Sequence, residues 1–447
     1  MIIPGIGLLY GGLARRKSAL ALLFQSFMVI AVVTFQWMFW GYSLAYSRDA
    51  SPFIGNLDNF GLRNVLVAPS PGNANLPEIV FCFYQLLFAA ATVQLVIGGS
   101  FERGRILPSL IFAFCWCTIV YCPIACWTWN ANGWLYNLPS LDFAGGGPVH
   151  IASGCSALAY AVVLGKRKHT GEASHGKPHN PTLVFLGTIL IWFGWFGFNV
   201  SLQPCISIKT YLMIPQGGSA LNATVRSMVA AFNTNTAASF GILGWVLVDM
   251  VRYKGKFSAV GACCGAISGL VGITPAAGYV SFWIAALIGF LTGVVCSSVQ
   301  NLNVWLRVDE GMDVFKLHGV GGIVGCFLTG IFAQQWVSSL DGATLAPGGL
   351  DGVGVQVGKQ LADICAISSY SFVVSAILLL ILKYTPGMGL RVSEEAEMIG
   401  LDVDQFHDEQ IGDWSMFEHN KPVTLAGKSQ PVSSAGSAHD AEGVKTA

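Results

Sequence analysis

The stretch from Ala19 to Tyr46 reads ALALLFQSFMVIAVVTFQWMFWGYSLAY and contains no charged side chain. A helix needs about 20 apolar residues to cross the hydrocarbon core of a bilayer, so this stretch is long enough to span one. The whole chain has the same character, because 53% of its 447 residues are hydrophobic and only 11% are charged. A soluble protein with so few charges would have little polar surface to present to water. The sequence therefore predicts an all-α integral membrane protein.

Apolar segments recur along the chain, at approximately 1–14, 19–46, 77–99, 106–129, 143–165, 182–203, 220–251, 258–277, 278–306, 314–335 and 357–385. The first is too short to cross a bilayer, and we expect it to be the second half of a truncated helix. Counting it gives eleven transmembrane helices in a membrane domain over residues 1–385. Residues 386–414 are expected to form a cytoplasmic regulatory segment, and the polar residues 415–447 a disordered cytoplasmic tail.

Basic side chains predict the orientation of these spans. They cluster in the breaks after spans one, three, five, seven and nine and after the last span, at Arg15, Arg16, Lys17, Arg103, Arg105, Lys166, Arg167, Lys168, Lys177, Arg252, Lys254, Lys256, Arg307, Lys316, Lys383 and Arg391. The breaks after even-numbered spans contain fewer, namely Arg48, Arg63, Lys209, Arg226 and Lys359. Because positive charge stays on the cytoplasmic side, we expect an extracellular N-terminus and a cytoplasmic C-terminus.

Two related segments indicate an internal duplication. One runs from Asp142 to His150 and reads DFAGGGPVH, and the other runs from Asp313 to Gly319 and reads DVFKLHG. They fall in spans five and ten, which are equivalent positions if the chain consists of two inverted five-helix repeats plus one extra helix. Transporters built on inverted repeats place the substrate near the middle of the membrane.

Glycines at helical spacing predict close packing between spans. Gly261, Gly265 and Gly269 form a ridge in one span, and Gly289 and Gly293 form another in the next. Small residues allow helix backbones to approach closely in lipid. We expect this packing to suit a narrow, well-defined channel.

His150 and His318 lie deep inside apolar spans, where an ionisable side chain is costly and marks a functional site by default. Three interpretations are open: neutral core histidines that bond a neighbour, a transport site, and metal ligands. A metal would need a third ligand, and the other histidines lie in the loop after span five or in the tail, at His169, His175, His179, His407, His419 and His439. The equivalent placement of the two histidines favours the transport site.

Two buried imidazoles have a defined chemistry. Burial favours the neutral ring, which donates from one nitrogen and accepts at the other. Two such rings in contact offer donors and acceptors to a small neutral solute, or a relay for a proton. Trp129, at the end of span four, either belongs to an interfacial aromatic belt or holds an entering cation by an attraction worth roughly 0.5–2 kcal/mol.

The sequence also argues against several other classes of function. The formal net charge is zero, and nothing indicates nucleic-acid binding. The 12 cysteines show neither a secreted disulfide pattern nor CxxC metal spacing, so we expect reduced, packed thiols. The chain contains no HExxH, no GxSxG and no pair of acids within a span, which argues against an intramembrane enzyme. We expect no cofactor and no bound metal.

The sequence resembles the Amt/Mep/Rh family of ammonium transporters, and in particular fungal Mep-type permeases. The matching stretches are Pro4–Leu13 (PGIGLLYGGL), Asp142–Gly146 (DFAGG) with His150, Trp195–Asn199 (WFGFN), Gly269–Ala276 (GLVGITPA) and Asp313–Gly322 (DVFKLHGVGG). The resemblance runs from residue 1 to about 412. It implies an eleven-helix subunit, a homotrimer and one pore in each subunit.

The resemblance also implies roles for particular residues. His150 and His318 match the paired pore histidines, and Phe88 and Phe198 match two stacked gating phenylalanines. Trp129, Tyr84 and Ser201 are assigned to the outer substrate-binding vestibule. Asp142 and Asp313 are assigned structural roles, Asp142 as a helix cap.

Two positions bear on how closely the chain follows the family pattern. The family usually places a serine four residues after the second gating phenylalanine, where this chain has Leu202, with Ser201 one residue earlier. Some fungal members replace the first pore histidine with an acid, whereas this chain keeps His150. That makes it more similar to the high-affinity, sensor-linked group.

The implied function is transport of ammonium or ammonia, with methylammonium as an analogue, across a lipid bilayer that we expect to be the plasma membrane. Ammonium would be recruited as a cation, deprotonated, and passed as ammonia through a hydrophobic pore. Two alternatives stay open: a sensor whose transport is secondary, and an electroneutral gas channel of the Rh type. The serine-rich tail would be the contact for a regulatory kinase or a signalling partner.

Overall fold

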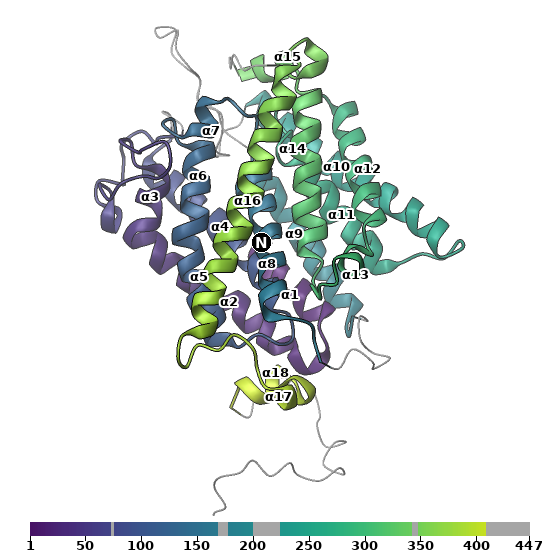
Figure 1. Cartoon of the computed structure of the whole chain (residues 1–447). Helices are drawn as coiled ribbons and strands as arrows, with labels where there is room; N and C mark the ends of the chain where they lie inside the picture. The colour runs from purple at the N-terminus through teal and green to yellow at the C-terminus, as the bar shows by residue number, and fades with distance from the viewer. Residues whose placement is uncertain (73–75, 169–177, 200–223, 342–346, 408–447) are drawn as a thin grey trace, which may run out of the picture. The chain divides into compact units, whose positions relative to one another are not determined.

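The computed structural model of the chain describes residues 1–72, 76–168, 178–199, 224–341 and 347–407. In these ranges the regular structure is helical, and extended pairing is limited to two isolated bridges, Pro69 with Pro77 and Gly104 with Arg391. The fold of the described residues is therefore all-α (Figure 1).

The described residues form eleven apolar helical segments, and several of these are divided where the backbone changes helix type. In chain order they are α1 (Ile2–Leu13); α2 (Ala19–Gln36) continuing through η2 (Trp37–Gly41) into α3 (Tyr42–Tyr46); α4 (Glu78–Ile97); α5 (Ile106–Trp116) continuing through η5 (Cys117–Tyr121) into α6 (Cys122–Trp129); η6 (Gly146–Ile151) with α8 (Ala152–Leu164); α9 (Pro181–Asn199); α10 (Val225–Arg252); α11 (Ala259–Ile273); α12 (Phe282–Ser298); η7 (Phe315–Val320) with α14 (Gly321–Phe332); and α16 (Val355–Tyr384).

Eight of these segments are long and apolar enough to cross a membrane, while α1, α11 and α12 are shorter. Each segment falls on one of the predicted spans. The predicted ends of the sixth span and the start of the seventh extend into residues 200–223, which lie outside the described residues.

The predicted ninth span, 278–306, is wrong at its second end. α12 ends at Ser298, and a separate short helix, α13 (Leu302–Leu306), follows it. The polar residues Gln300 and Asn301 interrupt the apolar run here. Trp305 in α13 is 66% exposed, so its apolar character reflects a surface position rather than a continuing buried span.

The two predicted repeats are visible in the way their histidine-bearing segments pack. η6 and η7 are both π-helical turns that precede a regular helix. η6 packs against α14, η7 packs against α8, and the two turns also contact each other. This exchange of equivalent contacts is what two inverted halves facing each other produce.

The predicted glycine ridges hold three helices together, and this packing is confirmed. A Cβ atom on Gly265 or Gly293 would collide with backbone atoms of Gly241 in α10, and one on Gly269 or Gly289 would collide with the backbone of Ala237 in the same helix. The ridges of α11 and α12 therefore pack directly on the backbone of α10, as small residues permit in membrane helices.

The long helix α16 crosses the view in Figure 1 from the end where α15 (Gln335–Ser338) lies to the end where α17 (Glu394–Ile399) and α18 (Leu401–Gln405) lie. We call the end with α17 and α18 the tail face, and the end with α15 the opposite face. The buried residues of α16 include five polar side chains, and the full set is Gln356, Gln360, Asp363, Ile364, Ile367, Ser371, Ser375 and Leu379. Gln360 bonds the carbonyl groups of Leu141 and Cys326 (2.7 and 3.2 Å), so α16 ties residues of both halves together.

The described part of the tail contacts the membrane domain through polar groups. The Asp402 carboxylate accepts hydrogen bonds from the backbone N–H groups of Leu20 and Ala21 (3.1 and 2.8 Å) at the start of α2. The backbone of the loop around Gly104 pairs with that around Arg391. Residues 408–447, which include the whole of the predicted disordered tail (415–447), lie outside the described residues.

Candidate functional site

His150 and His318 meet in the interior of the membrane domain. Their Nδ1 atoms are 3.2 Å apart and the ring centroids 5.2 Å. His150 is fully buried and His318 is 6% exposed. At this separation one imidazole donates a hydrogen bond and the other accepts it. The rings predicted from the two repeats are thus brought together from sequence positions 168 residues apart.

The segment that carries His150 is shaped by Asp142. Its carboxylate accepts hydrogen bonds from the backbone N–H groups of Gly145, Gly146 and Gly147 at 2.7–2.8 Å. Gly145 has φ of 115°, a left-handed conformation that glycine adopts without strain. The N–H of His150 then bonds the Gly145 carbonyl at 3.2 Å, five residues back, which is the π-helical spacing. Asp142 has the contacts of a helix cap.

In the second half, the corresponding contacts are made by Glu310 rather than Asp313. Glu310 is buried and accepts hydrogen bonds from the N–H groups of Met312 and Phe315, each at 3.2 Å. Glu310 precedes His318 by eight residues, the same interval that separates Asp142 from His150. Asp313 instead forms an ion pair with Lys316 at 2.6 Å. The sequence comparison of the two segments aligned the wrong acid, because it relied on residue type next to the apolar run.

Aromatic rings cover the histidine pair on the opposite-face side. Phe88 and Phe198 stack with ring centroids 4.1 Å apart and planes inclined by 18°. Trp129 meets Phe88 edge-on at 6.0 Å. The Tyr84 hydroxyl donates to the carbonyl groups of Gly197 and Phe198 (2.6 and 3.0 Å), which links α4 to α9 beside the stack. These four predicted residues form one contiguous group.

Trp195 lies beside the histidine pair, although the sequence did not indicate a role for it. Its indole stacks on the His150 ring at 5.2 Å with planes inclined by 12°, and its Nε1 donates to the Thr274 hydroxyl at 3.0 Å. Trp195 lies three residues before Phe198, so both project from one face of α9. That spacing was the available signal for its position.

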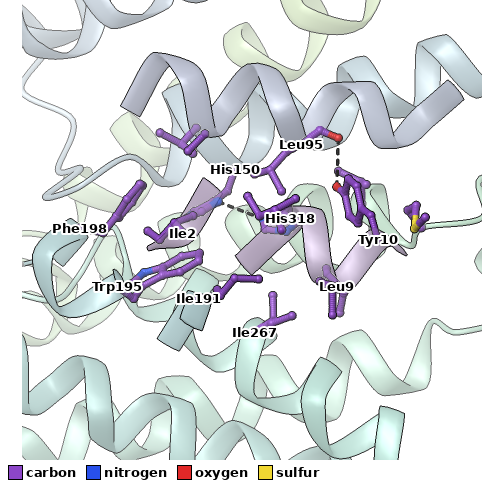
Figure 2. A pocket seen from close by; sticks show the side chains of 16 residues that line it. Ile2, Leu9, Tyr10, Leu95, His150, Ile191, Trp195, Phe198, Ile267 and His318 are labelled. Atoms are coloured by element: carbon purple, nitrogen blue, oxygen red, sulfur yellow. Dashed lines mark hydrogen bonds between the residues drawn. The ribbon is translucent and has the colours of Figure 1, made fainter. Parts of the chain in front are cut away.

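A narrow cavity of about 20 Å³ runs along the histidine pair, room for about one water-sized molecule. Figure 2 shows His150 and His318 pointing toward each other with Trp195, Ile191, Ile267 and Leu9 around them. The wall is almost entirely apolar, and consists of Ile2, Ile6, Leu9, Tyr10, Ala91, Leu95, Val149, His150, Ile191, Trp195, Phe198, Ile267, Met312, Val314, Leu317 and His318. Among the described residues, no partner bonds Nε2 of the buried His150.

A larger cavity of about 330 Å³ opens on the tail-face side. Leu9, Ile267, Met312 and Leu317 line both cavities, so the two adjoin. The larger cavity is lined by charged as well as apolar side chains, among them Arg15, Glu102, Arg167 and Asp313. The aromatic stack, the histidine slot and this cavity thus lie next to one another in the domain.

The charges at the tail-face cavity are paired with each other. Glu102 bonds Arg15 (3.0 Å) and Arg167 (2.9 Å), and Arg167 also bonds Asp309 at 2.7 Å. Burial alone would lower the pKa of Arg167, but its bonds to Asp309 and Glu102 outweigh burial and raise that pKa above its ordinary value. Burial, together with the nearby charge of Asp313, raises the pKa of Glu310 to about 7.

The predicted vestibule residue Ser201 and its neighbour Leu202 lie outside the described residues. The structure also reveals a carboxyl pair that the sequence analysis missed, because Asp142 and Asp363 approach each other beside Cys326. One of these acids precedes a span and the other lies in a different span, so inspection of single spans could not detect the pair.

The Ammonium Transporter Family profile matches residues 1–411 of the chain. The chain belongs to the Ammonium Transporter Family. Ammonium transporter 1 of Schizosaccharomyces pombe is 46% identical over 429 residues, which cover 96% of this chain and 82% of that protein. Ammonium transporter MEP2 of Saccharomyces cerevisiae is 48% identical over 416 residues, which cover 91% of this chain and 79% of that protein.

Solved structures agree with this assignment. The crystal structure of Candida albicans Mep2 matches with a TM-score of 0.81 at 46% identity, covering 88% of this chain and 83% of that one. As a member of the Ammonium Transporter Family, the chain is a multi-pass membrane protein that transports ammonium, and it is not an enzyme. The predicted family, all-α polytopic fold and transport function are thereby confirmed.

Proposed function

We propose that the chain binds ammonium at the opposite face, transfers one of its protons to water at that face near the phenylalanine stack, and passes ammonia along His150 and His318 to the tail-face cavity. The observation that carries this mechanism is the contact between two imidazoles, 3.2 Å apart, inside a slot with apolar walls. The slot has room for about one small molecule and offers it hydrogen-bonding nitrogens at one place.

The apolar wall supports passage of a neutral solute. An unpaired cation in such a slot would carry a large desolvation cost. Ammonium can avoid that cost by losing a proton, whereas potassium cannot. Deprotonation therefore separates two cations of similar size, and the histidine nitrogens compensate the ammonia molecule for the hydrogen bonds that it loses in water.

The aromatic group supports recruitment and exclusion of water. The indole of Trp129 and the ring of Phe88 present π faces and edges where an entering ammonium ion would first lose water, and such contacts are worth roughly 0.5–2 kcal/mol. The stacked Phe88 and Phe198 lie next to His150, since the Phe198 and His150 centroids are 5.9 Å apart. A rotation of either phenyl ring would open the slot.

We further propose that the opposite face is extracellular, that the tail face is cytoplasmic, and that three copies assemble in a plasma membrane. The basic residues near the ends of spans support the orientation. The oligomeric state is open to direct measurement of the mass of the detergent-solubilised protein.

The direct test of the mechanism is His318→Ala, with labelled methylammonium uptake and current measured in liposomes that contain the full chain. We expect uptake to fall about tenfold, which corresponds to about 1.4 kcal/mol in the barrier. His150→Ala should act in the same direction. Loss of discrimination against potassium in either variant would show that the pair also contributes to selectivity.

His179→Ala is the matched control, because His179 lies outside the slot and its Nδ1 contacts the Ala14 carbonyl at 2.9 Å. This variant should transport like the wild type. Unchanged uptake and selectivity in His318→Ala, with correctly folded protein, would remove the histidine pair from the mechanism. An ammonium pulse that produces no current in the wild type would indicate that ammonia crosses without the proton, whereas a current would indicate that the proton crosses as well.

A sensor role is a second candidate, and the tail contacts favour it. Glu397 of the tail bonds Arg391 (2.6 Å) and the Lys168 backbone, and its carbonyl accepts a hydrogen bond from Arg15 at the tail-face cavity. Residues 386–407 thus touch the charged network at one mouth of the route, where a kinase or signalling partner could act. A solved structure titled a sensor Amt protein matches at 26% identity with a TM-score of 0.78. A transport-inactive variant that still triggers the cellular nitrogen response would establish this role.

A further inference from the structure

A buried cluster beside the histidine pathway brings together three elements. Asp142 comes from the loop before η6, Cys326 from α14, and Asp363 from the buried residues of α16. All three residues are buried, and one side-chain oxygen or sulfur atom of each lies within 4.8 Å of the others. The cluster therefore joins the two inverted halves to the extra helix.

The two carboxyl groups have very different surroundings. Asp142 accepts three backbone hydrogen bonds, which is the environment of an ionised carboxylate. Asp363 is fully buried, and among the described residues no hydrogen-bond partner reaches either of its oxygens. An ionised carboxylate without a donor is costly in an apolar interior, and a second negative charge close by adds to that cost.

We propose that Asp363 is a neutral carboxylic acid whose proton is shared with the Asp142 carboxylate, so that the two side chains form a proton-binding site with a single negative charge. The O–H group of Asp363 then has an acceptor, and Asp142 gains a fourth hydrogen bond. A hydrogen bond from the O–H of a carboxylic acid to a carboxylate oxygen is charge-assisted and therefore strong.

Gly147 leaves free the space beside both carboxyl groups. A Cβ atom at this position would lie 3.3 Å from Oδ2 of Asp142, 3.4 Å from Oδ2 of Asp363 and 2.5 Å from Cδ1 of Ile367. Both Oδ2 atoms therefore converge on the space that the absent side chain leaves. A larger residue would separate η6 from α16 and, with it, the two acids.

The shared proton gives Asp363 a positioning role toward His150. Asp142 holds the N–H groups of three consecutive glycines at the start of η6, and His150 lies three residues after the last of them. Asp363 fixes the orientation of the Asp142 carboxylate from the side of α16. The proposal concerns the charge and geometry of this brace, and it does not depend on the route that ammonia takes past the histidines.

A divalent metal is the competing occupant, because two carboxylates and a thiolate are metal ligands. A structural zinc site, however, has four protein ligands, and among the described residues only three groups converge here. Three of the four accepting directions of Asp142 already receive backbone N–H groups. A proton needs only the two facing oxygens.

The test is infrared absorption of the purified full chain, in the region where protonated carboxyl groups absorb separately from carboxylates. At neutral pH we expect Asp363→Asn to remove one protonated-carboxyl signal that shifts when the wild type is placed in D2O. Asp249→Asn is the control, since Asp249 is a buried acid paired with Arg252 at 2.9 Å, and the signal should persist in that variant.

Uptake measurements on two variants of Asp363 distinguish its positioning role from a contribution of side-chain packing alone. Asp363→Asn retains a donor for Asp142, so we expect uptake close to that of the wild type. Asp363→Leu has similar size and no donor, and we expect uptake to fall about tenfold. Rescue by asparagine but not leucine is a pattern that mere packing would not produce.

Two results would overturn the proposal. One is an unchanged protonated-carboxyl signal in a folded, transport-competent Asp363→Asn variant. The other is zinc or another divalent metal in near-equal amount to the purified wild type, lost from both Asp363→Asn and Cys326→Ser. Failure of His318→Ala to affect uptake would bear on the transport mechanism alone, because the infrared signal reports on a different pair of residues.

Discussion

Glu310 lies eight residues before His318, near the tail-face cavity, and its pKa of about 7 exceeds its ordinary value of 4.5. A carboxyl group whose pKa is raised on folding stabilises the folded state fully below its unfolded pKa, and this contribution is lost as the pH rises through the folded value. Because of Glu310, the free energy of unfolding should therefore fall as the pH rises from about 4.5 to about 7.

Glu310→Gln tests this dependence. We expect the Tm of the variant minus that of the wild type to increase as the pH rises from 4.5 to 7, because glutamine has no charge to bury. Thermal unfolding in detergent across this range is the measurement. Glu395→Gln, at an exposed position of α17, serves as the control. A difference in Tm that does not change with pH would contradict the assignment.

At the residue scale, sequence reasoning identified the groups whose type is unusual for their setting. Two histidines within apolar spans are conspicuous in any sequence, whereas the family resemblance was needed to select Phe88 and Phe198 among many phenylalanines. Trp195, Glu310 and Asp363 were missed for a common physical reason. Each acts through a partner that is distant in sequence or through a backbone contact, and neither is visible before the chain folds.

At the element scale, the two halves depend on a close approach between α8 and η7. A Cβ atom on Gly154 would collide with the backbone nitrogen of Gly319, next to His318. We expect Gly154→Ala to destabilise the protein by about 1–3 kcal/mol, the usual cost of overpacking, and to lower methylammonium uptake by displacing the His318 turn.

Gly358→Ala is a matched control for this variant, because Gly358 lies in α16 and a Cβ atom there would meet nothing within 4 Å. Alanine is the better helix former by about 1 kcal/mol, so this variant should be as stable as the wild type or more so. Equal Tm values for the two variants would argue against tight packing at Gly154.

The tail segment offers a second test at this scale. Asp402 caps the first turn of α2, so Asp402→Ala should weaken the docking of residues 386–407 by about 1 kcal/mol, as for other lost caps. Limited proteolysis should cut this segment several-fold faster. Asp404→Ala is the control, since among the described residues the Asp404 carboxylate bonds only the side chain of the adjacent Gln405. Equal cutting rates would rule out this anchor.

The elements themselves were largely predictable, and their ends were not. Hydropathy identifies an apolar run because a bilayer demands one, and all eleven runs correspond to helical segments of the structure. It cannot detect the π-helical turns, since they do not change the composition of the run, whereas the break after Ser298 is marked by the polar residues Gln300 and Asn301. The π-helical turns arise from local hydrogen bonds, such as the bond from the His150 N–H to the Gly145 carbonyl.

At the scale of the whole molecule, the charge pattern predicts which face meets the cytoplasm. An epitope attached to the C-terminus should bind antibody only in permeabilised cells, while one inserted near Asn56, in the exposed loop between α3 and α4, should bind in intact cells. The physical reason is that Lys and Arg near span ends resist translocation. The opposite labelling pattern would invert the proposed direction of uptake.

The whole-molecule arrangement of two inverted halves was foreseen because two histidine-bearing segments recur in the sequence. The placement of the extra helix was not foreseen. α16 reads as an ordinary apolar span, yet its Gln360 and Asp363 contact residues of both halves. A few polar residues barely change the mean hydropathy of a span. That these polar residues share one face becomes evident only from the 3.6-residue period of the helix.

The π-helical turns make the pore unusually sensitive to chain length. Each residue of an α-helix rotates the following part by about 100°, so deletion of a single residue between Gly146 and Ile151 would convert that turn to α-helix and swing the downstream face away from its neighbour. The same applies to Phe315–Val320 in the other half. Such a one-codon loss would leave the hydrophobic pattern intact and still abolish the meeting of the rings.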